Sequence, residues 1–265
     1  MAALLGALQG VAEFLPISSS GHLSLAQRWL GIDASAGGHS FNIVVHAGTL
    51  LAVLVHYRRD LLDLLRGVLD GQAQARRMAL GLIIGTLPLA AALAPGFKEL
   101  IIRGEDSPRF VGVCLLITAA LLAFTHRRHV PPAEPDDPKA VPGPGMAILI
   151  GAAQLMATAP GISRSGATIA AALGLGIDRV HSARFSFLLS IPAILGATTV
   201  EGLELLEAGS DAALSADVIA IGFVTSFVVG MASLRLLLAM LVRLGLLPFV
   251  PYLVLAGAAA IVFGG

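Results

Sequence analysis

The residues that could do chemistry in this sequence gather in two short polar segments inside otherwise apolar stretches. In the first segment, Gln9 and Glu13 stand four residues apart, so on a helix they share a face. A carboxylate in apolar surroundings is costly and marks a functional site with a partner nearby. The alternative is a structural role, in which Glu13 caps backbone N–H groups. The first segment therefore predicts a buried acid that needs a partner.

A Ser-Ser-Ser-Gly-His turn at 18–22 follows the acid and opens a new helix. Backbone N–H groups at a helix N-terminus favour an anion. The hydroxyl groups can donate to phosphate oxygens or supply a nucleophile, and His22 could move a proton near neutral pH. Helix capping explains one serine, but not three serines and a histidine. The candidate residues of this turn are Ser18, Ser19, Ser20, Gly21 and His22.

The second polar segment, 163–168, also stands at a predicted helix start. Its Arg164 carries a planar guanidinium whose geometry suits phosphate. A purely structural Glu13–Arg164 ion pair is the alternative, and it would equally bring the two segments together. The segment lacks the lysine of a P-loop, and the chain has no Gly-x-Ser-x-Gly elbow. The accompanying candidates for phosphate contacts are Ser163, Ser165, Gly166 and Thr168.

Two weaker candidates lie in the apolar run 41–57. His46 could face the same cavity, and Asn42 could make a polar contact near its outer mouth. Neither residue carries the prediction of a site.

The composition indicates what must surround these segments. Of 265 residues, 56% are hydrophobic and 13% are charged, against about 25% charged in an average soluble domain. Much of the surface must therefore face lipid. The formal net charge of zero gives no reason to expect nucleic acid as a partner. The single cysteine, Cys114, excludes a disulfide framework and a cysteine-based metal site.

The apolar pattern predicts an all-α integral membrane protein. The stretches 1–30 and 146–177 are broken by proline, glycine and serine. Irregular, non-helical backbone at membrane depth must be enclosed by protein or line a cavity. We therefore predict two re-entrant helix–turn–helix pairs. Six further apolar runs predict transmembrane helices, at about 41–57, 79–95, 110–125, 185–200, 218–242 and 248–263.

Charged residues predict the orientation of these helices. Basic residues concentrate in a loop at 58–77, a proline-rich linker at 126–145 and a short segment at 178–184, whereas 201–217 contains only acidic charges. Lys and Arg favour the cytoplasmic side. Six spans then alternate without conflict, and both termini lie outside.

The sequence also contains an internal duplication. Shifted by 145 residues, 1–33 pairs with 146–178 at 16 identical positions of 33. Each copy adds three spans, an odd number, so the second copy is inverted. Inverted repeats with broken helices place their site near the midplane. We predict one membrane domain, 1–265, with repeat 1 at about 1–125, a cytoplasmic linker at 126–145 and repeat 2 at 146–265, whose two polar segments meet.

At these residues the sequence resembles the undecaprenyl-diphosphate phosphatase family, the bacitracin-resistance membrane proteins of bacteria. The resemblance covers nearly the whole chain. It rests on three stretches, which are QxxxEFLPISSSGH at 9–22, FNIVVHAGT at 41–49 and PGISRSGAT at 160–168.

The resemblance implies hydrolysis of undecaprenyl diphosphate to the monophosphate and inorganic phosphate, which recycles the carrier for cell-wall synthesis and gives bacitracin resistance. It implies a divalent cation, Mg or Ca, held by Glu13 and Gln9, and Ser19 or His22 as nucleophile. It implies that Arg164 holds the phosphate. Gln9 and Asn42 stand where relatives often have acids, which puts the choice of cation in question.

The resemblance also implies a multi-pass protein of the bacterial cytoplasmic membrane, with its active site open to the periplasm. The expected partners are a polyprenyl diphosphate, membrane lipids and a second copy of the chain in a homodimer. A polyprenyl-phosphate transporter or flippase is the main alternative, because inverted repeats are typical of transporters. A phosphatase that also carries its product across the membrane and an intramembrane serine hydrolase acting on acyl bonds are further alternatives.

Overall fold

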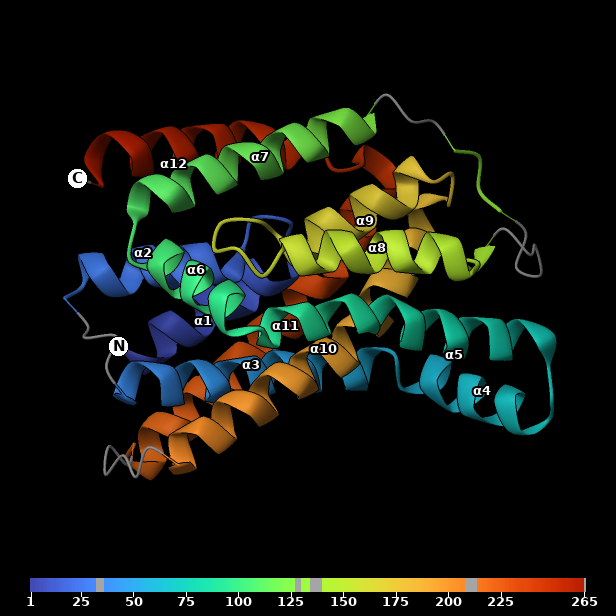
Figure 1. Cartoon of the computed structure of the whole chain (residues 1–265), viewed down its shortest axis with the longest axis horizontal. Helices are drawn as coiled ribbons and strands as arrows, with labels where there is room; N and C mark the ends of the chain where they lie inside the picture. Colours follow the sequence, from blue (N-terminus) through green and yellow to red (C-terminus); the bar gives the residue numbers. More distant parts are fainter. Residues whose placement is uncertain (32–35, 127–129, 134–139, 208–213, 265) are drawn as a thin grey trace.

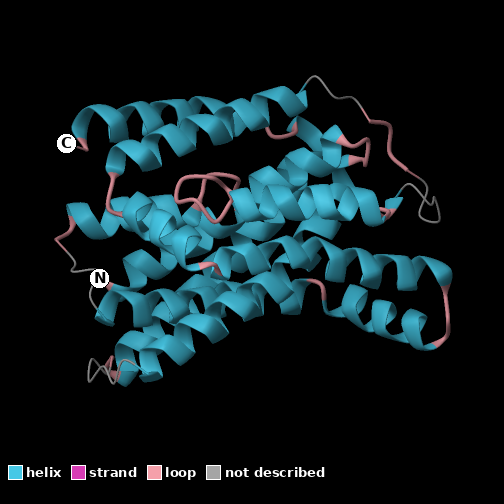
Figure 2. Cartoon of the chain, in the orientation of Figure 1, coloured by secondary structure: helices cyan, strands magenta, loops and turns pink. Residues whose placement is uncertain are grey.

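The computed structural model describes residues 1–31, 36–126, 130–133, 140–207 and 214–264. Throughout this part of the chain the regular elements are helices, as the sequence predicts (Figure 2). In chain order they are α1 Ala2–Phe14, α2 Ser19–Trp29, α3 Ala36–His56, α4 Arg58–Leu69, α5 Ala73–Thr86, η1 Leu87–Leu93, α6 Pro95–Glu105, α7 Pro108–His126, α8 Pro144–Met156, α9 Arg164–Gly174, α10 Arg179–Glu207, α11 Ala216–Leu244, η3 Leu247–Phe249 and α12 Val250–Phe263.

Four stretches of the described chain are long and apolar enough to cross a membrane. They are α5 continued by η1, α7, α10 and α11, and each overlaps one of the predicted runs. The predicted run 41–57 lies in α3, which forms a fifth candidate span with α4 despite a 66° bend between them. The run 248–263 corresponds to α12, whose 14 residues fall short of a full span. Membrane helices are therefore confirmed, and the six-span arrangement stays a prediction.

The prediction of a loop at 58–77 is wrong. This segment contains α4 and the start of α5. Leucines recur among the arginines of α4 at helical spacing. Leu61 and Leu64 pack against the core, whereas Leu62, Leu65 and Leu69 are exposed. Within α4, Asp60 pairs with Arg184 at 2.7 Å. Residues 127–129 and 134–139 of the predicted linker 126–145 lie outside the described residues.

Both predicted breaks are present, and their causes are local. α1 ends because Pro16 disfavours helical backbone at the residue before it, and Leu15 is extended with ψ 141°. The second break contains Gly161 at φ 100°, which side-chain-bearing residues rarely adopt. The four helices that flank the breaks have 13, 11, 13 and 11 residues. At 1.5 Å per residue none of them reaches across a core of about 30 Å.

The helices of the two halves pack crosswise, meaning that a helix of one half lies on a helix of the other half. α1 lies on α11, whereas its counterpart α8 lies on α5. α3 likewise contacts α11, and α10 contacts α5, while α7 and α12 pack on each other (Figure 1). When each helix is replaced by its counterpart in the other half, the α1–α11 pair becomes the α8–α5 pair and the α3–α11 pair becomes the α10–α5 pair. All of these pairs are present. Each broken helix pair is thus supported by the other half of the chain.

Glycines permit this close packing. A Cβ on Gly112 of α7 would lie 2.7 Å from the backbone oxygen of Gly257 in α12, and a Cβ on Gly257 would lie 2.8 Å from that of Gly112. Small residues let helix backbones approach in this way inside membranes. In one direction only, a Cβ on Gly6 of α1 would lie 2.8 Å from the backbone oxygen of Gly222 in α11, and a Cβ on Gly151 of α8 would likewise meet that of Gly85 in α5.

We predict that Gly112→Leu destabilises the fold by about 1–3 kcal/mol, because the side chain must push α7 and α12 apart. Thermal unfolding in detergent measures the effect as a lowered Tm. The matched control is Gly196→Leu in α10, where a Cβ would meet no atom within 4 Å. Equal Tm values for the two variants would contradict the close α7–α12 contact.

Candidate active site

The two helix breaks meet inside the protein, as the sequence predicts. Ser18 Oγ accepts a hydrogen bond from the backbone N–H of Gly161 at 3.1 Å. In the opposite direction, Ser165 Oγ donates to the backbone oxygen of Phe14 at 3.1 Å. The meeting point is tight, since a Cβ on Gly21 would lie 2.9 Å from the backbone of Gly161. The N-termini of α2 and α9 are therefore held next to each other.

Glu13 lies at the centre of the polar contacts. Arg164 Nη2 donates to its Oε1 at 2.5 Å, which joins the two halves of the chain. The Ser19 hydroxyl donates to Oε2 at 2.6 Å, and Gln9 Nε2 donates to the same oxygen at 3.1 Å. The side chain of Glu13 is 5% exposed, so its charge is compensated by these donors rather than by water. The buried acid of the first segment thus has a partner in the second, through the ion pair that the sequence offered as the structural alternative.

Two buried polar atoms beside this carboxylate have no hydrogen-bond partner. They are Nη1 of Arg164, a donor, and Oε1 of Gln9, an acceptor. Orphaned buried polar groups are costly and call for a ligand, water or ion. The Arg164 guanidinium thus holds the carboxylate with one nitrogen and has another buried nitrogen without a partner.

Both ring nitrogens of His22 are engaged by groups other than Glu13. Nδ1 lies 2.8 Å from the backbone oxygen of Ser18, and Nε2 lies 2.6 Å from the hydroxyl of Tyr252 in α12. A carbonyl oxygen can only accept, so Nδ1 carries the hydrogen and the tyrosine donates to Nε2. The two rings also stack, with centroids 5.6 Å apart. His22 is therefore held against α12 by its own partners.

The remaining candidate hydroxyls mostly stabilise the turns. Ser18 and Ser163 cap α2 and α9 by accepting from the N–H groups three residues later. Thr168 Oγ1 contacts the Arg164 backbone oxygen and Ser186 Oγ, and Ser20 Oγ lies 3.5 Å from Ser18 Oγ. A Cβ on Gly166 would lie 3.2 Å from Pro16. Direct phosphate contacts from Ser163, Ser165 and Thr168 stay predictions.

His46, a weak candidate in the sequence, belongs to the central cluster. Its Nε2 lies 4.0 Å from Glu13 Oε2, while its Nδ1 is bonded to the Asn42 backbone oxygen at 2.8 Å. The Asn42 side chain instead accepts a hydrogen bond from Gln27 at 3.1 Å. The structure thus brings His46 to the acid and ties Asn42 to α2.

Three residues that support the site were missed from the sequence. Thr118 Oγ1 bonds both the Gly161 oxygen and the Ser163 N–H, and so fixes the second turn on α7. Ser186 holds Thr168, and Tyr252 holds His22. Thr118 and Tyr252 each stand alone in an apolar run, and Ser186 is one of three serines spaced four residues apart on α10, with Ser182 and Ser190. Only the folded contacts show which of these residues support the site.

Ser18 is the one non-glycine residue at positive φ among the described residues, with φ 75° and ψ 99°. Such strain costs about 1–3 kcal/mol and persists where the surroundings enforce it. The counterpart Ser163 has the same capping role at an ordinary φ of −73°. The strain is thus specific to the turn that carries Ser19.

We predict that glycine is tolerated better than alanine at both caps, with a larger difference at position 18. Glycine is the better N-cap at each site. At Ser18 it also relieves the strained φ, so the excess over the same difference at Ser163 should be about 1 kcal/mol or more. Thermal unfolding of Ser18→Gly, Ser18→Ala, Ser163→Gly and Ser163→Ala measures this excess. Equal differences at the two sites would show that Ser18 is unstrained.

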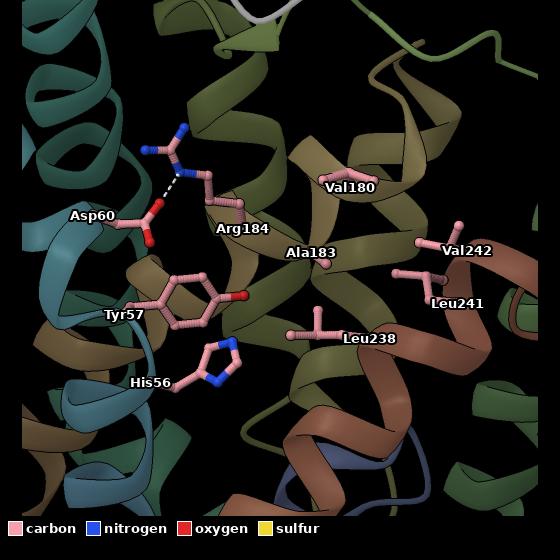
Figure 3. Close-up of a pocket in the computed structure, with 9 residues that line it drawn as sticks. All are labelled: His56, Tyr57, Asp60, Val180, Ala183, Arg184, Leu238, Leu241 and Val242. Carbon is pink, nitrogen blue, oxygen red and sulfur yellow. Dashed lines mark ion pairs between the residues drawn. The ribbon is translucent and has the colours of Figure 1, made fainter.

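A pocket of about 250 Å³ lies away from this cluster, where α3 bends into α4 (Figure 3). His56 and Tyr57 line it together with apolar residues of α10 and α11, and the Asp60–Arg184 ion pair stands at one side. His56 is ten residues beyond His46 on α3, or about 15 Å along the helix. The pocket therefore does not contain the candidate site residues.

Comparison with known proteins identifies the chain's relatives. The family model described as bacitracin resistance protein BacA matches residues 2–259. A relative named undecaprenyl-diphosphatase from Novosphingobium aromaticivorans is 39% identical over 262 residues, covering 98% of this chain and 96% of the relative. Proteins of the same name from Methanosphaera stadtmanae and Trichlorobacter lovleyi are 37% and 40% identical, over 98% and 97% of this chain and 96% and 93% of their own lengths.

Proposed function

The chain belongs to the bacitracin resistance protein BacA family, and we propose that the junction of its two helix breaks is the active site of an undecaprenyl-diphosphatase. The protein dephosphorylates undecaprenyl diphosphate, and so takes part in cell-wall synthesis and bacitracin resistance. One observation carries the location of the site. The Arg164 guanidinium holds Glu13, which holds the Ser19 hydroxyl, and still has a buried nitrogen without a partner.

The diphosphate group is proposed to bind between the starts of α2 and α9. The first backbone N–H groups of a helix have no partner within the helix and favour an anion. Two such N-termini converge here, because Ser18 and Gly161 are hydrogen-bonded to each other. Arg164 Nη1 would donate to a phosphate oxygen while Nη2 stays on Glu13. Phosphoryl transfer depends mainly on such positioning and charge neutralisation.

We assign the nucleophile to Ser19 rather than His22. Ser19 Oγ already donates to a carboxylate oxygen, which can receive its proton. In contrast, the lone pair of His22 Nε2 accepts a hydrogen bond from the Tyr252 hydroxyl. Ser19 Oγ would bond to the terminal phosphorus while the bond between that phosphorus and the bridging oxygen breaks. This step would release undecaprenyl phosphate. Water would then attack the phosphoserine, return the hydroxyl to Ser19 and release inorganic phosphate.

The residues at the junction fit a divalent cation that binds together with the diphosphate. Among the described side chains there is no group of three His, Cys, Asp or Glu that would form a metal site alone. Mg²⁺ often uses one or two carboxylates and completes its shell with substrate phosphates and water. Glu13 and the unpartnered Oε1 of Gln9 would contribute from the protein. When bound, the cation would neutralise charge on the diphosphate.

The finer arrangement in the membrane remains part of the proposal. The crosswise helix pairs support two inverted repeats, 1–125 and 146–265, each with a re-entrant pair and three spans. With basic segments inside, the site would open to the periplasmic side of the bacterial cytoplasmic membrane. The undecaprenyl tail would lie among lipids between helices. The homodimer stays a prediction.

Phosphate release tests the proposed function. Purified protein in detergent should release one inorganic phosphate from each undecaprenyl diphosphate when a divalent cation is added. A transporter or flippase would bind polyprenyl phosphates and release none with any cation. The names of the relatives favour the enzyme.

A further inference from the structure

His46 has the hydrogen-bond pattern of a metal ligand. Its Nδ1 faces the Asn42 backbone oxygen at 2.8 Å, which can only accept, so Nδ1 carries the hydrogen. Nε2 then presents a lone pair when the ring is neutral. Histidines that bind metals usually donate their other ring N–H to such an acceptor, which fixes the tautomer and orients the ring.

Nε2 of His46 lies near a place where other acceptors gather. Nε2 lies 4.0 Å from Glu13 Oε2, too far for a hydrogen bond. Two metal bonds of about 2.0–2.2 Å reach across such a gap. The amide of Gln9 contacts the same oxygen through Nε2, while its Oε1 is buried without a donor. Rotating this amide exchanges its nitrogen and oxygen and turns a third acceptor toward the same point.

With the Gln9 amide turned in this way, the donors around this point are too few to satisfy its acceptors. The Arg164 guanidinium is bonded to the other carboxylate oxygen of Glu13, Oε1. Ser19 supplies one hydrogen to Oε2 and cannot also satisfy Nε2 and the Gln9 oxygen. A cation would satisfy all three acceptors together. His46 is partly exposed, with 28% of its side chain accessible, so an ion could reach it.

We propose that His46 Nε2 is a ligand of the catalytic cation, beside Glu13 Oε2 and the amide oxygen of Gln9, with the diphosphate completing the shell. This inference rests on the proposed function. The cation would then have a nitrogen ligand, whereas a site made only of carboxylates would favour Mg²⁺ or Ca²⁺. Imidazole suits Zn²⁺ and other transition metals. The site should therefore bind Mn²⁺ or Zn²⁺ more tightly than Mg²⁺.

Electron spin echo spectroscopy of Mn²⁺ tests the ligand directly. The probe is Mn²⁺ with a farnesyl methylenediphosphonate, whose P–C–P bridge is not hydrolysed. Wild-type protein in detergent should show ³¹P coupling from the analogue and ¹⁴N modulation from an imidazole. His46→Gln should lose the ¹⁴N modulation and weaken Mn²⁺ binding by about tenfold or more. His22→Gln, the matched control, should keep the modulation because Tyr252 occupies that ring nitrogen.

The outcomes separate this inference from the proposed function. Coupling to ³¹P without ¹⁴N in the wild type, or ¹⁴N modulation that survives in His46→Gln, would overturn the assignment of His46 and leave the phosphatase in place. Protein that binds no Mn²⁺ in the presence of the analogue would also overturn it. If the wild-type protein released no phosphate from undecaprenyl diphosphate with any cation, the proposed function would instead be rejected. Circular dichroism and Tm show whether His46→Gln is folded.

Discussion

Replacing Arg164 by alanine is expected to lower kcat/KM for undecaprenyl diphosphate by about 10³-fold or more. An arginine that stabilises a transferring phosphoryl group contributes about 10³–10⁵ in kcat. Here Arg164 would have two tasks, because one nitrogen holds the Glu13 carboxylate and another is free for phosphate. Its removal would also leave Glu13 buried without its counter-charge. Inorganic phosphate release, measured under single-turnover conditions, gives the effect on the chemical step.

Arg164→Lys distinguishes charge from geometry. Lysine keeps the positive charge but lacks the planar fork, so it cannot hold carboxylate and phosphate along the two fixed directions. We expect it to recover only a small part of the activity lost in Arg164→Ala. Full recovery by lysine would show that charge alone is needed.

The matched control for Arg164 is Arg184→Ala. Arg184 also forms an arginine–carboxylate pair, with Asp60 at 2.7 Å, but beside the pocket at the α3–α4 bend (Figure 3). Its removal should leave kcat within about threefold of the wild type, because exposed pairs contribute about 0–1 kcal/mol. An intramembrane acyl hydrolase would instead cleave an acyl ester and release no phosphate, and Arg164→Ala would leave that cleavage nearly unchanged.

Ser19→Ala is the second substitution with a large expected effect. If Ser19 is the nucleophile, its removal should lower kcat by about 10³-fold or more, as losing a catalytic serine does elsewhere. With terminally ³²P-labelled substrate and rapid acid quenching, the wild type should carry label that is stable to acid, as phosphoserine is. The Ser19→Ala protein should carry none.

His22→Gln provides the comparison within the same turn. Because its ring is bonded to the Ser18 backbone and to Tyr252, its loss should loosen the turn and lower activity by about 10-fold to 100-fold, without removing the acid-stable label. Tyr252→Phe should have a similar, smaller effect. Label that is labile to acid and disappears in His22→Gln would identify a phosphohistidine, and the assignment to Ser19 would be wrong.

The sequence predicts much of the arrangement because two independent signals agree. Proline and glycine mark where backbone helices cannot continue, so Pro16 and Gly161 locate both breaks without knowledge of the fold. The in-register duplication then requires the breaks to be equivalent. The Glu13–Arg164 pair, 151 residues apart in the chain, follows from the cost of leaving either charge alone in an apolar interior.

Other features depend on contacts that no local pattern encodes. The segment of α4 was predicted to be a loop because its arginines were used to predict the side of the membrane that it faces. The helical spacing of its leucines was not used. The separation of the two histidines also depends on tertiary packing. His22 lies next to Ser19 in sequence but turns to Tyr252, whereas His46 arrives from α3 beside Glu13. Proximity in the sequence therefore does not show which histidine lies beside the acid.

The crosswise packing has a consequence for how the protein is made. α1 rests on α11, and about 200 residues separate the end of one from the start of the other. At a synthesis rate of about 5–20 residues per second, α1 waits about 10–40 s for its supporting helix to leave the ribosome. During that interval its glycine-lined face and its carboxylate are in the bilayer without α11 and Arg164. A chain truncated before α11 should thus be recognised and degraded, because the last helices to be inserted complete both the fold and the catalytic centre.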